Sequence, residues 1–227
     1  MEKRQFSQEG LKILACAAML LDHLGASILP WIGLRIVGRL AFPIFCFLLA
    51  EGVVYTKSPL RYGMRLFVCM LLSEFPFDLY SSGRFSWAGQ SAMATLFLSF
   101  LLCRCMQRTP SLLVRLLWIL PFSLAAELLR TDYGGFGVMM AALFFLSRDL
   151  PMRTALQAVG LLCLCWCLGG IPVSLGTFTI PIELFALAAL LPISRYSGEK
   201  KCHSRTLQWC FYLFYPAHLA VLAIFFR

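Results

Sequence analysis

The sequence predicts an all-α integral membrane protein with about nine transmembrane helices, eight or ten being the alternatives. Two observations lead to this fold class. The 227 residues are 60% hydrophobic and only 14% charged, with a mean hydropathy of +0.79, whereas soluble domains are about half apolar and a quarter charged. The apolar residues also gather into segments close to the ~20 residues that cross a bilayer as a helix.

The apolar segments follow one another with short connections, so we expect a single polytopic membrane domain over residues 1–227. The first segment contains Asp22 and His23 and lacks a clear small-residue cleavage site, which favours a retained helix over a signal peptide. The segment 134–147 is short, and we expect it to be tilted, re-entrant or extended by its neighbours. The predicted helices cover 10–29, 33–54, 62–80, 90–106, 111–129, 134–147, 154–170, 175–192 and 208–226.

Lysine and arginine alternate between the predicted connections, and this alternation predicts the orientation. One set of connections holds few of them, namely Arg84, Arg130 and Arg227 at helix ends, with Arg35 and Arg39 entering the second helix. The amino terminus is therefore expected in the cytoplasm and the carboxyl terminus outside, in a bacterial cytoplasmic membrane. The cytoplasmic set comprises Lys3, Arg4, Lys12, Lys57, Arg61, Arg65, Arg104, Arg108, Arg115, Arg148, Arg153, Arg195, Lys200, Lys201 and Arg205.

Charge and cysteine content exclude several classes of protein. The formal net charge is +9, but nucleic-acid binding needs basic residues clustered on a water-exposed face, and here they lie between apolar runs. Most of the ten cysteines lie within apolar segments, where cysteine behaves as a small hydrophobe. We expect neither a disulfide framework nor a metal site, and the polar loop 194–206, with His203, is expected to be solvated.

Ionisable residues within the predicted helices are expected to have a structural or functional role, because placing a charge deep in a bilayer costs about 2.5–3.5 kcal/mol or more. At ~1.5 Å per residue, four of them lie near the midplane: Asp22, His23, Glu74 and His218. Of the others, all but Glu183 are expected nearer one surface or the other. They are Arg39, Glu51, Asp78, Glu127, Asp132 and Glu183.

Glu74 and Asp78 are four residues apart and are expected on one helix face, although Pro76 should kink that helix. Arg39 enters an adjacent antiparallel helix, so an Arg39–Glu74 or Arg39–Asp78 pair could either hold two helices together or belong to a site. His23 could act as a general base or nucleophile once a carboxylate orients it. Asp22 points about 100° away from His23, so Glu74 or Asp78 is the alternative orienting group.

Five sequence blocks, taken in order, resemble the successive signatures of the TraX family and cover nearly the whole chain. One departure is GQSAMATLFLS, which stands where an Asn-containing stretch is expected. The five blocks are LKILACAAMLLDHLGA, LRIVGRLAFPIFCFLLAEGVVYT, RYGMRLFVCMLLSEFPFDL, DYGGFGV and FYLFYPAHL.

This family is named for a membrane protein that acetylates the amino terminus of a pilus subunit, and it resembles the wider transmembrane acyltransferase superfamily. The resemblance implies acetyl-CoA or another acyl-CoA as the donor. It also implies which positions match the family's motifs: Asp22, His23, Arg39, Glu51, Glu74, Asp78, Asp132, Tyr133, Tyr215, Pro216 and His218.

We therefore expect an acyltransferase that moves an acyl group, in the first place acetyl, from cytoplasmic acyl-CoA to an amine or hydroxyl. His23 would be base or nucleophile, and Arg39 would stabilise a carboxylate or the oxyanion. Arg61, Arg65 and Arg104 would hold the CoA phosphates, although the positive-inside rule alone also explains them. A proton-coupled transporter and a scaffold subunit are the rivals. The acceptor, whether peptide amino terminus, lipid, glycan or small amine, and the oligomeric state stay open.

Overall fold

The computed structural model describes residues 6–175, 177–200 and 204–226. Lys3, Arg4, Lys201 and Arg227, which contribute to the predicted orientation, and His203 lie outside these residues. The described chain forms two compact units, each discontinuous in sequence. Unit 1 comprises Met1–Phe45 and Leu146–Leu207, and unit 2 comprises Cys46–Phe145 and Gln208–Arg227. The prediction of a single membrane domain stays a prediction, and the two units are described separately.

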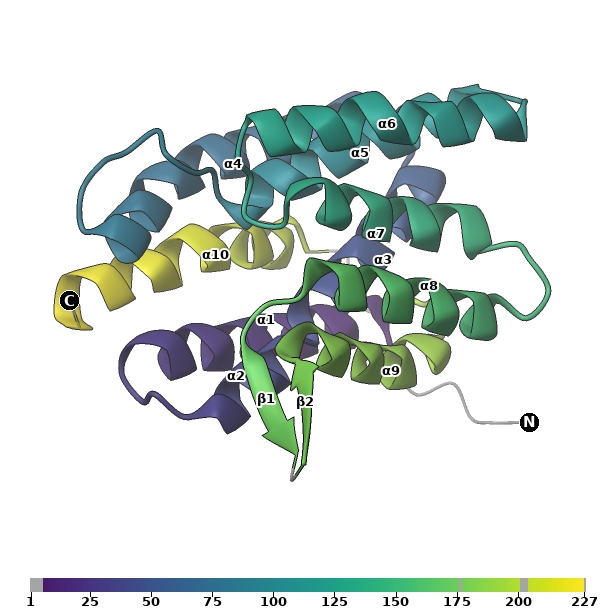
Figure 1. Cartoon of the computed structure of the whole chain (residues 1–227). Coiled ribbons are helices and arrows are strands. Elements are labelled where there is room, and N and C mark those ends of the chain that lie inside the picture. The colour runs from purple at the N-terminus through teal and green to yellow at the C-terminus, as the bar shows by residue number, and fades with distance from the viewer. Residues whose placement is uncertain (1–5, 176, 201–203, 227) are drawn as a thin grey trace. The chain divides into compact units, whose positions relative to one another are not determined.

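Unit 1 contains two long helices, several short elements and a β-hairpin (Figure 1). Ser7 starts the first helix, because its side chain accepts a hydrogen bond from the Gly10 backbone N–H at 3.2 Å, the arrangement of an N-cap. The first helix packs against the second, and the 3₁₀ helix η1 packs against both α2 and α8. The elements are α1 (Gln8–Ser27), α2 (Ile32–Gly38), α8 (Arg153–Leu168), β1 (Pro172–Leu175), β2 (Phe178–Pro181), η1 (Ile182–Ala189) and α9 (Leu190–Ser194).

The elements described for unit 2 are all helices, joined by short connections. Its helices α4, α5 and α6 are consecutive neighbours, α5 packing against both of the others (Figure 1). Three of its helices begin or end in unit 1, namely α3, α7 and α10. The elements are α3 (Ala41–Tyr55), α4 (Pro59–Ser82), α5 (Ala92–Arg108), α6 (Leu112–Leu128), α7 (Gly134–Ser147) and α10 (Arg205–Phe226).

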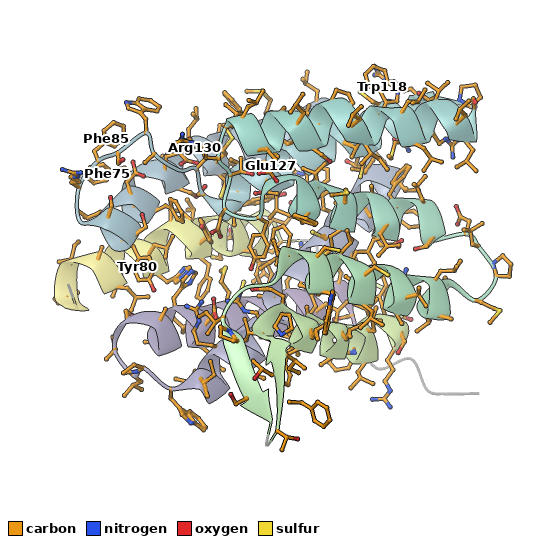
Figure 2. The ribbon with its side chains drawn as sticks, in the orientation of Figure 1. Phe75, Tyr80, Phe85, Trp118, Glu127 and Arg130 are labelled. Carbon is orange, nitrogen blue, oxygen red and sulfur yellow. The ribbon has the colours of Figure 1, made fainter. Side chains whose placement is uncertain are left out.

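Among the residues that the structure describes, three helical stretches are long and apolar enough to cross a membrane: Gln8–Ser27, Ile32–Tyr55 and Thr206–Phe225. Large apolar side chains also cover the outside of unit 2. Trp118 on α6 and Phe75 on α4 project away from the helices (Figure 2), and Phe75 is 61% exposed. Such surfaces are stable against lipid but not against water. The helical class is therefore confirmed and the apolar stretches point to a membrane protein, whereas nine spans and their orientation stay predictions.

The predicted helix over 175–192 is wrong in its first part. Residues 172–175 and 178–181 form an antiparallel pair of strands in which Pro172 pairs with Pro181 and Leu175 with Phe178. Gly169 and Gly170 end α8 with φ angles of 74° and 92°, values that glycine adopts without a steric cost. A hairpin and η1 replace the expected helix because two prolines and β-branched residues frame this stretch.

The predicted helix over 33–54 is interrupted, since α2 ends at Gly38 and α3 begins at Ala41. Pro43 explains the break. It has no backbone N–H, so it cannot donate to the carbonyl four residues earlier, which belongs to Arg39. The backbone N–H of Arg39 closes the last turn of α2 by donating to the carbonyls of Arg35 and Ile36, both at 3.2 Å. The interruption places the Arg39 side chain at the junction of two helices.

Candidate functional site

Arg39 is the centre of a buried ion-pair cluster in unit 1. Its Nη2 lies 2.5 Å from Asp22 Oδ2, and its Nη1 lies 2.7 Å from Glu183 Oε1. Its Nε also donates to the carbonyl of Arg35 at 3.3 Å. The residue is only 8% exposed. Three nitrogens of one guanidinium are therefore committed to the protein, and α1, α2 and η1 are joined at a single point.

Arg35 is the second cation of this cluster, and it is bound differently. Its Nε lies 3.3 Å from Asp22 Oδ1, and its side chain is 23% exposed. The separation suits an ion pair, but the alignment does not meet hydrogen-bond geometry for either atom. Two arginines thus face two carboxylates, and their formal charges cancel. We call Asp22, Arg35, Arg39 and Glu183 the arginine cluster.

Glycines allow α1 and α2 to approach closely enough to form the arginine cluster. A Cβ atom added at Gly38 would lie 2.6 Å from Asp22 Oδ1 and 2.7 Å from Asp22 Cγ, and one added at Gly25 would lie 2.8 Å from Leu34 Cβ. Real Cβ atoms do not reach such distances. The absence of a side chain at both positions brings the Asp22 carboxylate to the two arginines.

His23 follows Asp22 on α1 and is partly buried. Successive helical residues point about 100° apart, so its ring leaves the helix in a different direction from the Asp22 carboxylate. The Ser27 hydroxyl donates to the His23 carbonyl at 2.7 Å. Glu74 and Asp78, the other carboxylates expected to orient His23, belong to unit 2. Their pairing with His23, or with Arg39, stays a prediction.

Glu74 lies at a second polar cluster, in unit 2. Its carboxylate accepts hydrogen bonds from the Ser91 backbone N–H at 3.1 Å and from the Ser91 hydroxyl at 2.7 Å. Ser91 is the N-cap of α5, so a carboxylate from α4 satisfies the amino end of the next helix. Glu74 thereby joins two helices, a structural role that is compatible with a catalytic one.

Tyr215 brings α10 into the same cluster. It is 6% exposed, its hydroxyl accepts a hydrogen bond from the Ala92 backbone N–H, and it lies within electrostatic range of Asp132, Glu74 and Tyr133. The structure therefore gathers four of the predicted site residues, which α4, the α6–α7 connection and α10 supply. We call Glu74, Asp132, Tyr133 and Tyr215 the acidic cluster.

Two further carboxylates of unit 2, Asp78 and Glu127, have local structural partners. Asp78 is 4% exposed, and its Oδ2 accepts from the Ser86 backbone N–H at 3.0 Å. Glu127 Oε1 accepts from the Gly135 backbone N–H at 2.8 Å, and Figure 2 shows Glu127 near Arg130 at the turn between α6 and α7. Asp78 fixes the α4–α5 loop and Glu127 caps α7. Glu51 lies in the last turns of α3.

His218 lies one helical turn after Phe214 on α10 and is 7% exposed. Its Nδ1 is 2.7 Å from the Phe214 carbonyl oxygen. A carbonyl can only accept, so this contact assigns the proton to Nδ1. The imidazole also stacks on the Phe214 ring, with 5.1 Å between the centroids. The protein thus fixes the tautomer and the orientation of this ring.

The three arginines expected to hold CoA phosphates lie in unit 2, in different surroundings. Arg61 is exposed and its Nε donates to the Ser58 hydroxyl at 2.8 Å. Arg104 bonds to Gln107 one turn further along α5. The guanidinium of Arg65 lies over the rings of Tyr62 and Tyr212, 5.8 and 5.9 Å from their centroids. Arg65 is therefore held by two aromatic rings, a favourable cation–π arrangement.

Sequence reasoning missed two partners. Glu183 was counted among the ionisable residues but assigned no role, and Ser91 was not singled out. Both contacts join residues far apart in sequence, 144 residues for Arg39 with Glu183 and 17 for Glu74 with Ser91. The available signal was the rarity of an acid such as Glu183 in an apolar segment. The rarity of such an acid indicates that it has a polar or charged partner, but it does not indicate which residue that partner is.

The apolar helices point to a helical membrane protein, and buried charge clusters set polar groups into its interior. Comparison with known proteins then gives the family. The chain belongs to the TraX protein family, whose model matches residues 7–226.

Two relatives extend this result. A probable fimbrial assembly protein, FimC of serogroup H1 from Dichelobacter nodosus, is 30% identical over 96% of this chain and 94% of its own length. An uncharacterised protein of Rickettsia prowazekii (strain Madrid E) is 36% identical over 30% of this chain and 29% of its own length. No solved structure matches the chain.

Proposed function

We propose that this TraX family member is a membrane-embedded acyltransferase of the bacterial cytoplasmic membrane, which moves an acetyl or other acyl group from cytoplasmic acyl-CoA to an amine or hydroxyl. The observation that carries the proposal is the position of His23, directly after the carboxylate that the arginine cluster fixes. An imidazole on a rigidly held helix is suited to proton transfer. The match to the TraX family and the relative described as a probable fimbrial assembly protein support an acceptor connected with pilus assembly.

In the proposed reaction His23 acts as a general base. The acceptor amine attacks the thioester carbonyl, its nitrogen–carbon bond forms, and its proton passes to the imidazole nitrogen. The carbon–sulfur bond then breaks, and the imidazolium returns the proton to the departing thiolate. The products are an amide and free CoA, so atoms and charges balance. A hydroxyl acceptor would give an ester by the same steps.

The bonds of Arg39 alter the role proposed for it. Its Nε, Nη1 and Nη2 are already bonded within unit 1, so we assign Arg39 to positioning: it holds Asp22, and through it the turn of α1 that carries His23. Glu183 is its second anchor. We assign the binding of the donor phosphates to Arg61 and Arg104. Arg65, which Tyr62 and Tyr212 hold in place, is assigned to the same phosphate group as an additional positive charge.

The test is thiol release from acetyl-CoA by purified protein in detergent, with candidate amines and peptides supplied as acceptors. Wild-type protein should release CoA, and His23→Ala should lower the rate by about 10²–10⁴-fold, the usual contribution of a general base. His23→Gln keeps a similar volume and should lose activity while retaining the wild-type melting temperature. If wild-type protein neither binds acetyl-CoA nor releases CoA, the acyltransferase proposal fails.

A further inference from the structure

Arg35 presents the open end of its guanidinium. Across the residues that the structure describes, its one ion pair runs through Nε to Asp22 Oδ1 at 3.3 Å, and Nη1 and Nη2 have no protein partner. Arg39 differs, because it is 8% exposed and both of its Nη atoms are bonded to carboxylates. With 23% of its side chain exposed, Arg35 is the member of the arginine cluster that can reach a ligand.

The surroundings of Arg35 indicate where this ligand lies. Arg35 is one helical turn from the start of α2, which follows the α1–α2 loop over residues 28–31 (Figure 1). This loop and the first residue of α2 expose large apolar groups: Leu29 is 57% exposed, Trp31 64% and Ile32 41%. Tryptophan flanked by aliphatic residues is typical of the membrane–water interface, and lipid phosphates lie at that depth.

We propose that Arg35 binds the phosphate of a glycerophospholipid headgroup, with the α1–α2 loop seated in the interface beside it. The terminal edge of a guanidinium carries two parallel N–H groups that match two phosphate oxygens. Asp22 pairs with Nε, which leaves the edge formed by Nη1 and Nη2 for the phosphate. The site does not depend on the proposed acyl transfer, because it requires only the arginine cluster and the exposed loop.

The experiment measures retained lipid by native mass spectrometry of the full-length protein in detergent, supplied with dioleoylphosphatidylglycerol. A diacylglycerol with the same chains tests the need for phosphate, and millimolar inorganic phosphate tests whether the free ion suffices. Wild-type protein should retain about tenfold more phosphatidylglycerol than diacylglycerol, a factor typical of a charge-assisted bidentate contact. Inorganic phosphate should not displace the lipid.

Arg35→Gln should abolish the preference for the phosphate-bearing lipid. Arg108→Gln is the control, since Arg108 is an exposed arginine at the end of α5 that Gln107 and Thr109 flank in sequence, and it should behave as wild type. If Arg35→Gln fails to fold, Arg35→Lys retains the charge beside Asp22 but loses the paired donors, and it should bind several-fold more weakly. Equal lipid retention by wild type and both Arg35 variants would overturn the proposal. Displacement by inorganic phosphate would overturn the lipid as the ligand.

Discussion

Arg39 Nη2 lies 2.5 Å from Asp22 Oδ2, and this contact joins two helices of unit 1 at the residue directly before His23. The same guanidinium reaches Glu183 on η1 through its other terminal nitrogen. A buried cation between two carboxylates is stable only while both partners stay in place, because each charge has given up its water. Any change at this point should therefore affect the fold and the proposed chemistry together.

Replacing Arg39 with Gln leaves the Asp22 and Glu183 carboxylates buried without their main counterion. Removing one partner of a buried ion pair costs about 3–5 kcal/mol, so Arg39→Gln should lower the melting temperature strongly in detergent. Arg84→Gln removes an exposed arginine and should leave the melting temperature unchanged. A wild-type melting temperature for Arg39→Gln would show that the ion pairs contribute no net stability.

Asp22 and Glu183 should be coupled energetically, because they bind the same guanidinium. In a double-mutant cycle of Asp22→Asn and Glu183→Gln, the free energies of unfolding should depart from additivity by about 0.5–3 kcal/mol. Asp78→Asn provides the control, since Asp78 holds a loop of unit 2. Combined with Asp22→Asn it should be additive. Additivity in both cycles would mean that Arg39 does not connect the two carboxylates.

Gly38→Ala should disrupt the approach of α2 to Asp22. The added methyl group would overlap the Asp22 side chain, and relieving such an overlap typically costs about 1–3 kcal/mol. Gly89→Ala is a suitable control, because its added Cβ would lie 3.6 Å from the Arg130 carbonyl oxygen, an ordinary contact. Denaturation followed by circular dichroism should show a loss of stability for the first variant alone.

Glu74→Ala should destabilise the amino end of α5, because Ser91 would lose an acceptor for both its backbone N–H and its hydroxyl. Loss of a helix cap costs about 0.5–2 kcal/mol. Hydrogen exchange should therefore accelerate in the first turn of α5, with no change in α1. Glu74→Gln keeps an acceptor oxygen and should restore most of the protection. Unchanged exchange at Ser91 and the next residues in Glu74→Ala would contradict the capping role.

The positions of the helices could be predicted because each apolar segment is about as long as a helix that crosses a bilayer, so its length alone indicates a helix. The structure has helices over most of those segments, and Pro43 and the prolines of the hairpin mark the places where hydropathy alone misleads. Contacts such as Arg39 with Glu183 could not be predicted, because they join distant residues and neither helix periodicity nor charge indicates which acid meets which arginine. Motif resemblance pointed to Glu74, Asp132, Tyr133 and Tyr215 without indicating that they lie together.

The central claim, acyl transfer from a donor on one side of the membrane, is tested most directly in sealed proteoliposomes of known protein orientation. Acetyl-CoA, which does not cross the bilayer, is supplied to one face at a time, and free CoA is measured. We predict release only when acetyl-CoA faces the connections that carry Arg61 and Arg104, and a loss of at least a hundredfold in His23→Ala. Equal release from both faces, or release that His23→Ala leaves unchanged, would contradict the account.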